Sequence, residues 1–471
     1  MENSKSLRWW IVEDALRDRK GHWVEYLQTF QRGLIAEGDE VRFFASEECS
    51  PDVAALFDAE AILPRSIWAR MSDGASKWRR LLRIPAHGLA TYRAVSKLLA
   101  ACSALHAPGS SPTRVSWLAS SLSSLRFGWR YEPEDTLPAG RPLPDLIFVP
   151  TALVHHLVGW IPLIKRKLCK LPCRVLLFFP NAPVDLRDDE TAHVLPDPTA
   201  KLFRICIRSL AKEVASGKVI LGAETRPMTK ALSEVTGVPF TYLPHPVELS
   251  TEHSPDNGDS VGRLGDPSPQ TPVPATSSNP ILFGCYGAAR HEKGSDILQQ
   301  AIRLVLEGEP AIPARFAFQW LGDFLDAQGK LVKLDPWLKT HPKVDVIESY
   351  FEEGGYAERL AATDVMVLPY RAAYRLRVSR VVIEAINLGM PVVATRNTTL
   401  LEQAKEFGVA RGCSDGSAED LAASILDMVH DFAQLRDAAR AKVSGSRAHF
   451  SVKGFCDRLK HKNTAKTLRR S

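Results

Sequence analysis

Apolar and polar stretches alternate along the chain in the manner of an α/β fold. Short apolar runs at residues 9–12 and 41–44 are typical of buried parallel strands, and between them the apolar positions of residues 24–34 fall on one helical face. The same alternation returns later, and we expect further strands at residues 146–149, 174–179, 219–221, 240–243 and 281–286. The pattern predicts two sets of parallel strands with helices between them.

A polar stretch separates the two sets. Residues 250–280 are rich in Ser, Pro, Gly and Asp with almost no large apolar residue, which predicts a flexible linker or a disordered insertion. We therefore expect an amino-terminal domain over 1–249, a linker over 250–279 and a carboxyl-terminal domain over 280–445. Residues 446–471 are expected to form a basic, helical tail.

The stretch from residue 378 to 395 organises the second half. Ser379 suits a helix N-cap, Gly389 suits a helix stop, and strands are predicted at residues 365–368 and 391–394. Glu384 then lies in a helix beyond the carboxyl end of a strand, where open α/β sheets bind ligands. A carboxylate beside free helix amides suits a nucleotide sugar. Alternatively, Glu384 complements the helix dipole or pairs with Arg380.

A strand-to-helix loop at residues 287–294 combines glycines and cations. Gly287 and Gly294 allow close backbone approach, while Arg290 and Lys293 could offset the charge of a diphosphate. Taken alone, an Arg and a Lys in a loop are more often solvated charges. In the first half, Gly21 and His22 lie at a comparable loop-to-helix junction, where they could contact a ligand or serve only the loop geometry.

Composition sets outer limits on the class of protein. With 471 residues, 45% hydrophobic and 24% charged, the chain has the make-up of a globular protein with two or three domains. Its eight cysteines are scattered without zinc spacing, and residues 1–8 are polar with no apolar signal core. We therefore expect reduced thiols and a cytoplasmic location. The acidic run at residues 185–190 is interpreted as a solvated loop, and no metal site is expected.

One segment is strongly basic. Residues 61–130 carry eleven Lys and Arg against one Asp, a formal charge of +10 compared with +6 for the whole chain. Trp and Leu residues interleave with the charges, as in helices that lie on anionic membranes. A solvated helical face and a nucleic-acid groove are the alternatives, and we expect no nucleic-acid partner.

The uncharged run at residues 146–164 has about the length of a membrane span. It contains two Pro and two His and few strongly apolar residues for its length. We interpret it as a buried strand, a loop and a short helix.

With these motifs in hand, the second half resembles the family 4 glycosyltransferases of the GT-B fold, within the glycosyl transferases group 1. The resemblance rests on the loop from Arg290 to Gly294, on Glu384-Ala385 and on the run from Gly389 to Ala394, and it is specific over about residues 280–427. It implies two facing Rossmann-like domains with an interdomain cleft.

The resemblance also implies roles for residues. Arg290 and Lys293 would hold the donor diphosphate and stabilise the leaving group, and Glu384 would bind the ribose hydroxyls. The donor phosphate would meet the backbone of three consecutive residues, Ser379, Arg380 and Val381. Gly21, Gly287 and Gly294 would border the donor, and His22 and Asn181 would lie on the acceptor side.

Two departures from the family pattern matter. The first Glu of the paired acids should fall at Leu376, and the group that usually contacts the transferred sugar is therefore absent. Pro180-Asn181 stands where members commonly show a His. Arg375, Arg377 or Ser379 would then hold the donor sugar, or the protein binds without turnover.

The resemblance implies a retaining, metal-independent glycosyltransferase without a cofactor. The basic segment adds the expectation that this cytoplasmic protein lies peripherally on the inner face of the membrane. It would transfer a sugar from a UDP- or GDP-linked donor to a glycan or lipid-linked acceptor in glycan biosynthesis. A non-catalytic nucleotide-sugar or glycan-binding protein of the same fold and a sugar-nucleotide epimerase are the alternatives.

Overall fold

The structure is a computed structural model that describes residues 6–19, 23–66, 77–103, 142–181, 183–187, 189–249, 280–352 and 354–467, without the side chains of 77–82 and 461–467. Its contacts form two units. The amino-terminal unit comprises Met1–Leu243 with Lys460–Ser471, and the carboxyl-terminal unit comprises Pro244–Leu459. The linker expected over 250–279 lies outside the described residues, as do Gly21 and His22.

The amino-terminal unit is built on one parallel sheet of seven strands, in the order β3-β2-β1-β4-β5-β8-β9. Its strands are β1 Arg8–Glu13, β2 Glu40–Ser46, β3 Glu60–Leu63, β4 Leu146–Val149, β5 Arg174–Phe179, β8 Val219–Ala223 and β9 Thr241–Tyr242. The strands predicted at 146–149 and 174–179 are confirmed. The strand predicted at 240–243 is shorter, because only two residues pair with β8.

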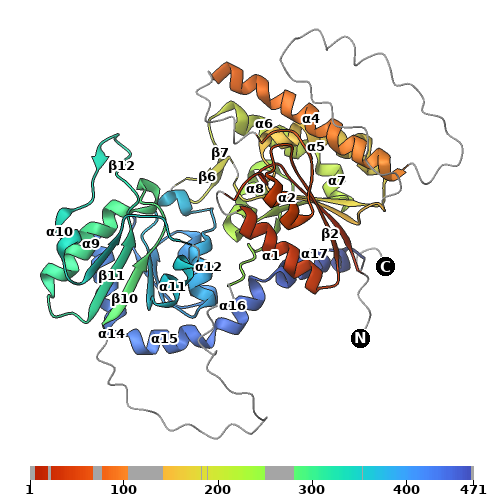
Figure 1. The fold of residues 1–471 in the computed structure, drawn as a ribbon. Coiled ribbons are helices and arrows are strands. Elements are labelled where there is room, and N and C mark those ends of the chain that lie inside the picture. Colours follow the sequence, from red (N-terminus) through yellow and green to blue (C-terminus); the bar gives the residue numbers. More distant parts are fainter. Residues whose placement is uncertain are drawn as a thin grey trace, which may run out of the picture. The chain divides into compact units, whose positions relative to one another are not determined.

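Helices cover this sheet (Figure 1). They are α1 Trp23–Ala36, α2 Pro51–Phe57, α4 Lys77–Ser103, α5 Val154–Arg166, α6 Pro198–Ser209, α7 Ala211–Ala215 and α8 Arg226–Thr236, and a small antiparallel pair, β6 Val184–Leu186 with β7 Ala192–Val194, extends from the layers. Aromatic rings fill the core between α1 and the sheet. Phe30 of α1 packs on Phe148, which also contacts Trp9 and Phe178.

The uncharged run at residues 146–164 forms β4 and most of α5, as the sequence predicts. Within the part of the chain that the structure describes, no helix is both long enough and apolar enough to cross a membrane. The eight cysteines all lie among the described residues and form no disulfide.

The basic segment contributes helix α4, whose later turns pack against α5. Val95, Leu98 and Leu99 are buried there, while Arg93 and Lys97 are exposed. Apolar burial therefore orders this half of the helix. Residues 67–76 and 104–141 lie outside the described residues, and membrane docking of the segment stays a prediction.

The carboxyl-terminal unit holds a second parallel sheet, of six strands in the order β14-β11-β10-β15-β16-β17. The strands are β10 Ile281–Cys285, β11 Ala314–Gln319, β14 Val344–Ile347, β15 Val365–Leu368, β16 Val392–Thr395 and β17 Ala410–Cys413, with a separate hairpin of β12 Phe324–Leu325 and β13 Leu331–Val332. The helices are α9 Ser295–Gly308, α10 Pro336–Thr340, α11 Gly355–Ala361, α12 Arg380–Asn387, α13 Thr399–Phe407, α14 Ala418–His430, α15 Phe432–Ala441, α16 Val443–His449 and α17 Val452–Thr467.

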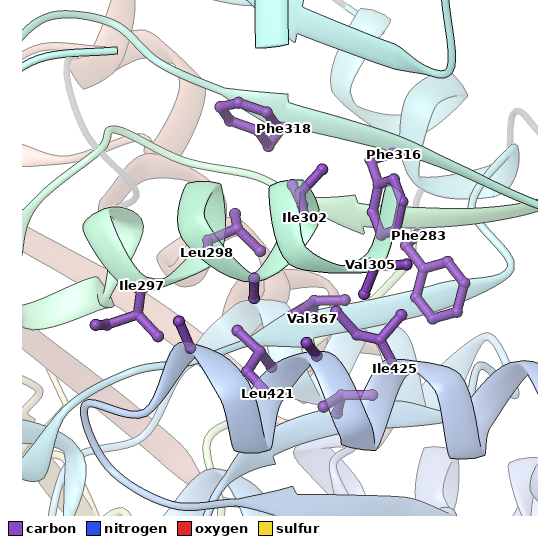
Figure 2. Packing of buried hydrophobic residues seen from close by; sticks show 14 of the residues in the cluster. Phe283, Ile297, Leu298, Ile302, Val305, Phe316, Phe318, Val367, Leu421 and Ile425 are labelled. Carbon is purple, nitrogen blue, oxygen red and sulfur yellow. The ribbon is translucent and has the colours of Figure 1, made fainter. Parts of the chain in front are cut away.

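Two of these helices, α9 and α14, cover one face of the sheet together (Figure 2). The apolar face of α9 lies in this cluster, where Ile297, Leu298, Ile302 and Val305 are buried. Burying one such side chain contributes about 1.5–3 kcal/mol to the free energy of folding. The cluster therefore holds α9 against the sheet and fixes the position at which the helix begins. The loop that precedes α9 is thereby held at the carboxyl end of β10.

Helix α12 lies between β15 and β16, as the sequence predicts. Gly389 ends it with φ +72°, and the amides of Gly389 and Met390 bond back to the carbonyls of Ile386 (3.0 Å) and Ala385 (2.9 Å). Ser379 occupies the N-cap position, but its side chain makes no capping hydrogen bond within the described structure.

The expected tail at residues 446–471 contains the end of α16 and the helix α17, which runs to residue 467, and it divides between the two units. Ser446 donates to the side chain of Asn387 (2.8 Å), and Arg447 donates to the Asn387 carbonyl (2.9 Å). The Val247 amide also bonds to the Phe450 carbonyl (2.9 Å). These bonds hold α16 on the end of α12, within the carboxyl-terminal unit.

Candidate functional site

The loop after β10 turns sharply at Gly287, where φ is +102°. The amide of Gly287 donates to Gln319 Oε1 (2.9 Å), and Gln319 Nε2 donates in turn to the Ser349 carbonyl (2.8 Å). A buried side chain at the end of β11 thus fixes the first residue of the loop. A left-handed backbone here favours glycine, because other residues are strained in it.

Lys293 lies directly over Gly287. A Cβ on Gly287 would stand 2.4 Å from Lys293 Nζ, so a larger residue there would displace the ammonium from this position. The same ammonium sits 5.6 Å from the ring centre of the buried Tyr370. Burial lowers the pKa of Lys293, and Arg290 lowers it further, against the opposing effects of Cys285 and Glu292.

Arg290, in contrast, is 61% exposed, with Glu292 as an ion-pair partner at 3.6 Å. An exposed pair of this kind contributes at most about 1 kcal/mol. The guanidinium can therefore leave Glu292 for an anionic ligand at little cost. The loop therefore offers a largely buried cation, Lys293, and an exposed cation that can move, Arg290.

Gly294 anchors the other end of the loop. Its φ is +62°, and a Cβ there would stand 2.0 Å from the carbonyl oxygen of Pro369, just beyond β15. Arg371 adds a second clamp from the same strand end, since it donates to the His291 carbonyl (3.0 Å) and to Asp296 (2.6 Å). The carboxyl ends of β10 and β15 are thus joined.

Glu384 is buried, with 5% of its side chain exposed. Arg380 donates to one carboxylate oxygen (2.7 Å), and the hydroxyl of Tyr356 on α11 donates to the other. The pairing with Arg380, which the sequence left as an alternative to ligand binding, is therefore present. Burial and then the charge of Glu384 raise the pKa of Tyr356, so the phenol stays a donor.

The two halves of the site meet through aromatic residues. Tyr370 lies beneath the ammonium of Lys293 and is close enough to Tyr356 to affect its pKa, after burial and the neighbouring Glu384. Tyr356 in turn contacts the ring of Tyr286, the residue after β10 (6.2 Å between centres). The cationic loop and the start of α12 therefore occupy one edge of one sheet.

Backbone amides complete the anion-binding character of this edge. The first amides of an α-helix have no partner inside the helix, and in α12 these belong to Arg380, Val381 and the residue after them. They carry the positive end of the helix dipole. Ser379 is buried immediately before them.

The structure brings together Gly287, Arg290, Lys293, Gly294, Ser379, Arg380, Val381 and Glu384 as expected. It adds Gln319, Tyr356 and Tyr370, which sequence reasoning missed. Asn181 belongs to the amino-terminal unit and is exposed in the turn after β5. Leu376 is 5% exposed and is packed as an apolar residue.

Part of the chain matches a known family. Residues 280–431 match the family model described as Glycosyl transferases group 1. No curated protein matches the chain.

Solved structures resemble the whole fold. A glycosyltransferase from Rickettsia africae ESF-5 is 11% identical, with 98% of each chain covered and a TM-score of 0.55. Sucrose-phosphate synthase from Thermosynechococcus elongatus is 13% identical, with 98% of this chain and 99% of that chain covered and a TM-score of 0.53. Anabaena HepE in complex with UDP-glucose is 11% identical, with 98% and 100% covered and a TM-score of 0.52.

At these identities the structural likeness establishes the fold, and the expected GT-B class is confirmed. The expected resemblance to group 1 glycosyltransferases is confirmed over the matched residues, which include the cationic loop and α12. The chain therefore has the GT-B fold, and its residues 280–431 are similar to the glycosyl transferases group 1 family.

Proposed function

We propose that the protein is a nucleotide-sugar-dependent, configuration-retaining glycosyltransferase that uses a UDP- or GDP-linked donor and a glycan or lipid-linked acceptor. The observation that carries the proposal is the joining of Lys293 and Glu384 at one sheet edge through Tyr370 and Tyr356. A sequestered cation beside an oriented carboxylate suits a ligand that has a diphosphate and a ribose. The binding of UDP-glucose by Anabaena HepE, of the same fold, is consistent with such a donor.

Each group has a role in this proposal. Lys293 and the first amides of α12 hold the diphosphate, and the exposed Arg290 closes on it when it binds. Glu384 accepts hydrogen bonds from the ribose hydroxyls, oriented by Arg380 and Tyr356. Gly287 gives the backbone close access to the phosphates.

In the transfer step the bond between the anomeric carbon and the diphosphate oxygen breaks, and the acceptor hydroxyl forms its bond on the same face. The departing diphosphate takes the proton of the acceptor. Charge grows on the leaving oxygen, and the fixed cations and amides stabilise it more in the transition state than in the ground state. These groups replace a catalytic metal in the proposal.

Turnover tests this proposal more sharply than binding. Donors linked to UDP and GDP are incubated with candidate glycan and lipid-linked acceptors, without added Mg²⁺ or Mn²⁺ and with EDTA during the assay, and products are detected by mass spectrometry. We expect transfer, or slow donor hydrolysis, from a matched donor. Arg290→Ala should lower kcat more than it lowers donor affinity, and Arg315→Ala, an exposed Arg of the same unit, should change neither.

A non-catalytic nucleotide-sugar-binding protein is the second candidate, and Leu376 favours it. The position that carries an acid in the family pattern holds a buried leucine here. Under this reading the nucleotide site is intact and the contact to the transferred sugar is lost. Tight nucleotide-sugar binding without transfer or hydrolysis across the full donor screen would support the binder and refute the enzyme.

The basic segment bears on where the protein works. We propose that residues 61–130 bring a cytoplasmic protein to anionic membrane lipids, with the formal charge of +10 supplying the attraction. Sedimentation with anionic vesicles should fall steeply as salt is added, because exposed charges are screened over about 10 Å at moderate ionic strength. Changing Lys77, Arg79, Arg80 and Arg83 to Ser should abolish it, and equal binding to neutral vesicles would contradict the idea.

A further inference from the structure

Three histidines and an aspartate meet at the carboxyl edge of the amino-terminal sheet. Asp14 follows β1, His155 and His156 lie in the first turn of α5 after β4, and His87 comes from α4. Each offers one ligand atom, and these four atoms all lie within 4.8 Å of one another. The residues are 5%, 8%, 5% and 8% exposed for Asp14, His155, His156 and His87.

A glycine contact brings α4 close enough for His87 to reach the others. A Cβ on Gly159 would stand 2.4 Å from the carbonyl oxygen of Gly88, so the two helices touch backbone to backbone. Gly88 follows His87 directly, and Gly159 lies one turn after His155. This backbone contact of α4 and α5 therefore lies beside the cluster.

The carboxylate of Asp14 is the centre of the cluster. His156 Nε2 lies 3.1 Å from Asp14 Oδ1, and His87 Nε2 lies 3.4 Å from Asp14 Oδ2. The rings of His155 and His156 are in contact, with centres 4.0 Å apart. All four side chains face one another in a region where little water can enter.

His155 Nε2 is a buried polar atom that has no hydrogen-bond partner among the described residues. Leaving such an atom unpaired costs about 1–3 kcal/mol, and buried polar atoms are normally satisfied. A small ligand at the centre of the four side chains would satisfy it. This unpaired nitrogen is independent of the close grouping of the other three residues.

We propose that Asp14, His87, His155 and His156 bind one divalent transition metal ion, of which Zn²⁺ fits best. Three imidazole nitrogens and one carboxylate oxygen are donors that zinc prefers, whereas Mg²⁺ prefers oxygen ligands. With bonds of about 2.0–2.1 Å, neighbouring ligands of a tetrahedral zinc stand about 3.4 Å apart. The four ligand atoms lie within 4.8 Å of one another, so small side-chain movements toward the ion would bring them to this spacing.

Four protein ligands leave no open position, so the ion is structural and ties α4 to the sheet. To bind the ion, His156 must give up one of its present hydrogen bonds. Its Nδ1 accepts from the Leu153 amide (3.2 Å), whereas ligation through Nε2 places the ring proton on Nδ1. The backbone of Thr151, within hydrogen-bond reach of the ring, can accept that proton.

Metal content and metal binding of the full-length chain test the site. After dialysis against a chelator, the chain is titrated calorimetrically with ZnCl₂ and with MgCl₂. We expect one Zn²⁺ per chain, no comparable Mg²⁺ binding, and a higher melting temperature with excess Zn²⁺. His155→Ala should weaken Zn²⁺ binding at least tenfold. His430→Ala, whose ring is 88% exposed, should leave it unchanged.

Co²⁺ provides a second measurement that needs no substitution. Bound in place of Zn²⁺, it should show the intense visible absorption of a tetrahedral site in the wild-type chain, whatever the stability of the His155 variant. Equal Zn²⁺ affinity in wild type and a folded His155→Ala would overturn the proposal. Absence of both stoichiometric Zn²⁺ binding and the tetrahedral Co²⁺ spectrum would also overturn it.

Discussion

The two parallel sheets present the same edge in different ways. At the carboxyl ends of β1 and β4, the amino-terminal unit buries a carboxylate among three imidazoles under α4. At the carboxyl ends of β10 and β15, the carboxyl-terminal unit places glycines, an exposed arginine and a lysine. Two parallel sheets thus carry a filled edge and a cationic edge, which we call the anion edge after the ligand proposed above, because the loops and added helices at the strand ends differ.

The largest effect is expected from Gly294→Ala. The left-handed backbone costs a non-glycine residue about 1–2 kcal/mol, and the new Cβ would overlap the Pro369 carbonyl, which adds about 1–3 kcal/mol. We expect a loss of about 3 kcal/mol in the free energy of unfolding, measured by urea denaturation.

Gly329→Ala is the matched control for that substitution, since Gly329 has φ +79° and nothing within 4 Å of its Cβ position. Gly329→Ala should lower the free energy of unfolding only by the cost of the left-handed backbone. Equal losses in the two variants would show that the close approach to Pro369 does not hold the loop, and the anion edge would then lack its anchor.

The contrast between the edges also explains what could be predicted from sequence. The strands and the anion edge could be predicted because each depends on local patterns: Gly287 to Gly294 form one loop, and Glu384 follows Ser379 by five residues. When binding groups lie so close in sequence, the local backbone conformation alone determines their relative positions. A family resemblance then supplied the roles that the pattern alone left open.

The histidine cluster could not be predicted in this way. Its members stand at positions 14, 87, 155 and 156, and they meet only because β1 and β4 pair and because Gly88 contacts Gly159. Residues so far apart in sequence form no local motif from which such a contact could be predicted. Tyr356 was missed for the same reason, since it reaches Glu384 from a separate helix.

Removing the sequestered cation should have the next largest effect. Lys293→Ala should weaken binding of UDP or GDP by about 2 kcal/mol, because a charge-assisted contact to the diphosphate is lost. Titration calorimetry measures this directly, with Lys339→Ala, an exposed lysine paired with Glu348, as the control. His155→Ala should leave nucleotide affinity unchanged, and a loss comparable to that of Lys293→Ala would mean that the two edges are coupled.

A smaller effect is expected when Tyr356 becomes Phe. The substitution removes the hydroxyl that donates to Glu384 but keeps the ring between Tyr286 and Phe351. We expect nucleotide affinity to fall by about 1 kcal/mol, because Glu384 loses an orienting hydrogen bond.

The loss on Tyr356→Phe should shrink for a nucleotide whose ribose lacks its hydroxyls, if Glu384 binds the ribose. Calorimetry with UDP and with its dideoxyribose analogue makes the comparison. An undiminished loss on the analogue would place the ribose elsewhere.

The smallest effect is a pH dependence at the anion edge. Burial lowers the pKa of Lys293, so its ammonium loses its proton at a lower pH than an ordinary lysine. The charged form binds the diphosphate, and affinity should therefore be constant below the lowered pKa and fall as pH rises through it. Bound diphosphate favours the charged form, so binding should take up protons in that range.

Lys293→Arg tests this sign, because a guanidinium keeps its charge to pH 12 or above. Affinities measured from about pH 7.5 upward avoid the second ionisation of the terminal phosphate, whose pKa is about 6. The wild type should lose affinity with rising pH and take up protons on binding in buffers of different ionisation enthalpy, while the arginine variant should do neither. Because deprotonation removes the charge of Lys293 but keeps its side chain, the decline must not exceed the loss in Lys293→Ala. A parallel decline in both variants would assign the titration to another group and leave Lys293 as a fixed charge.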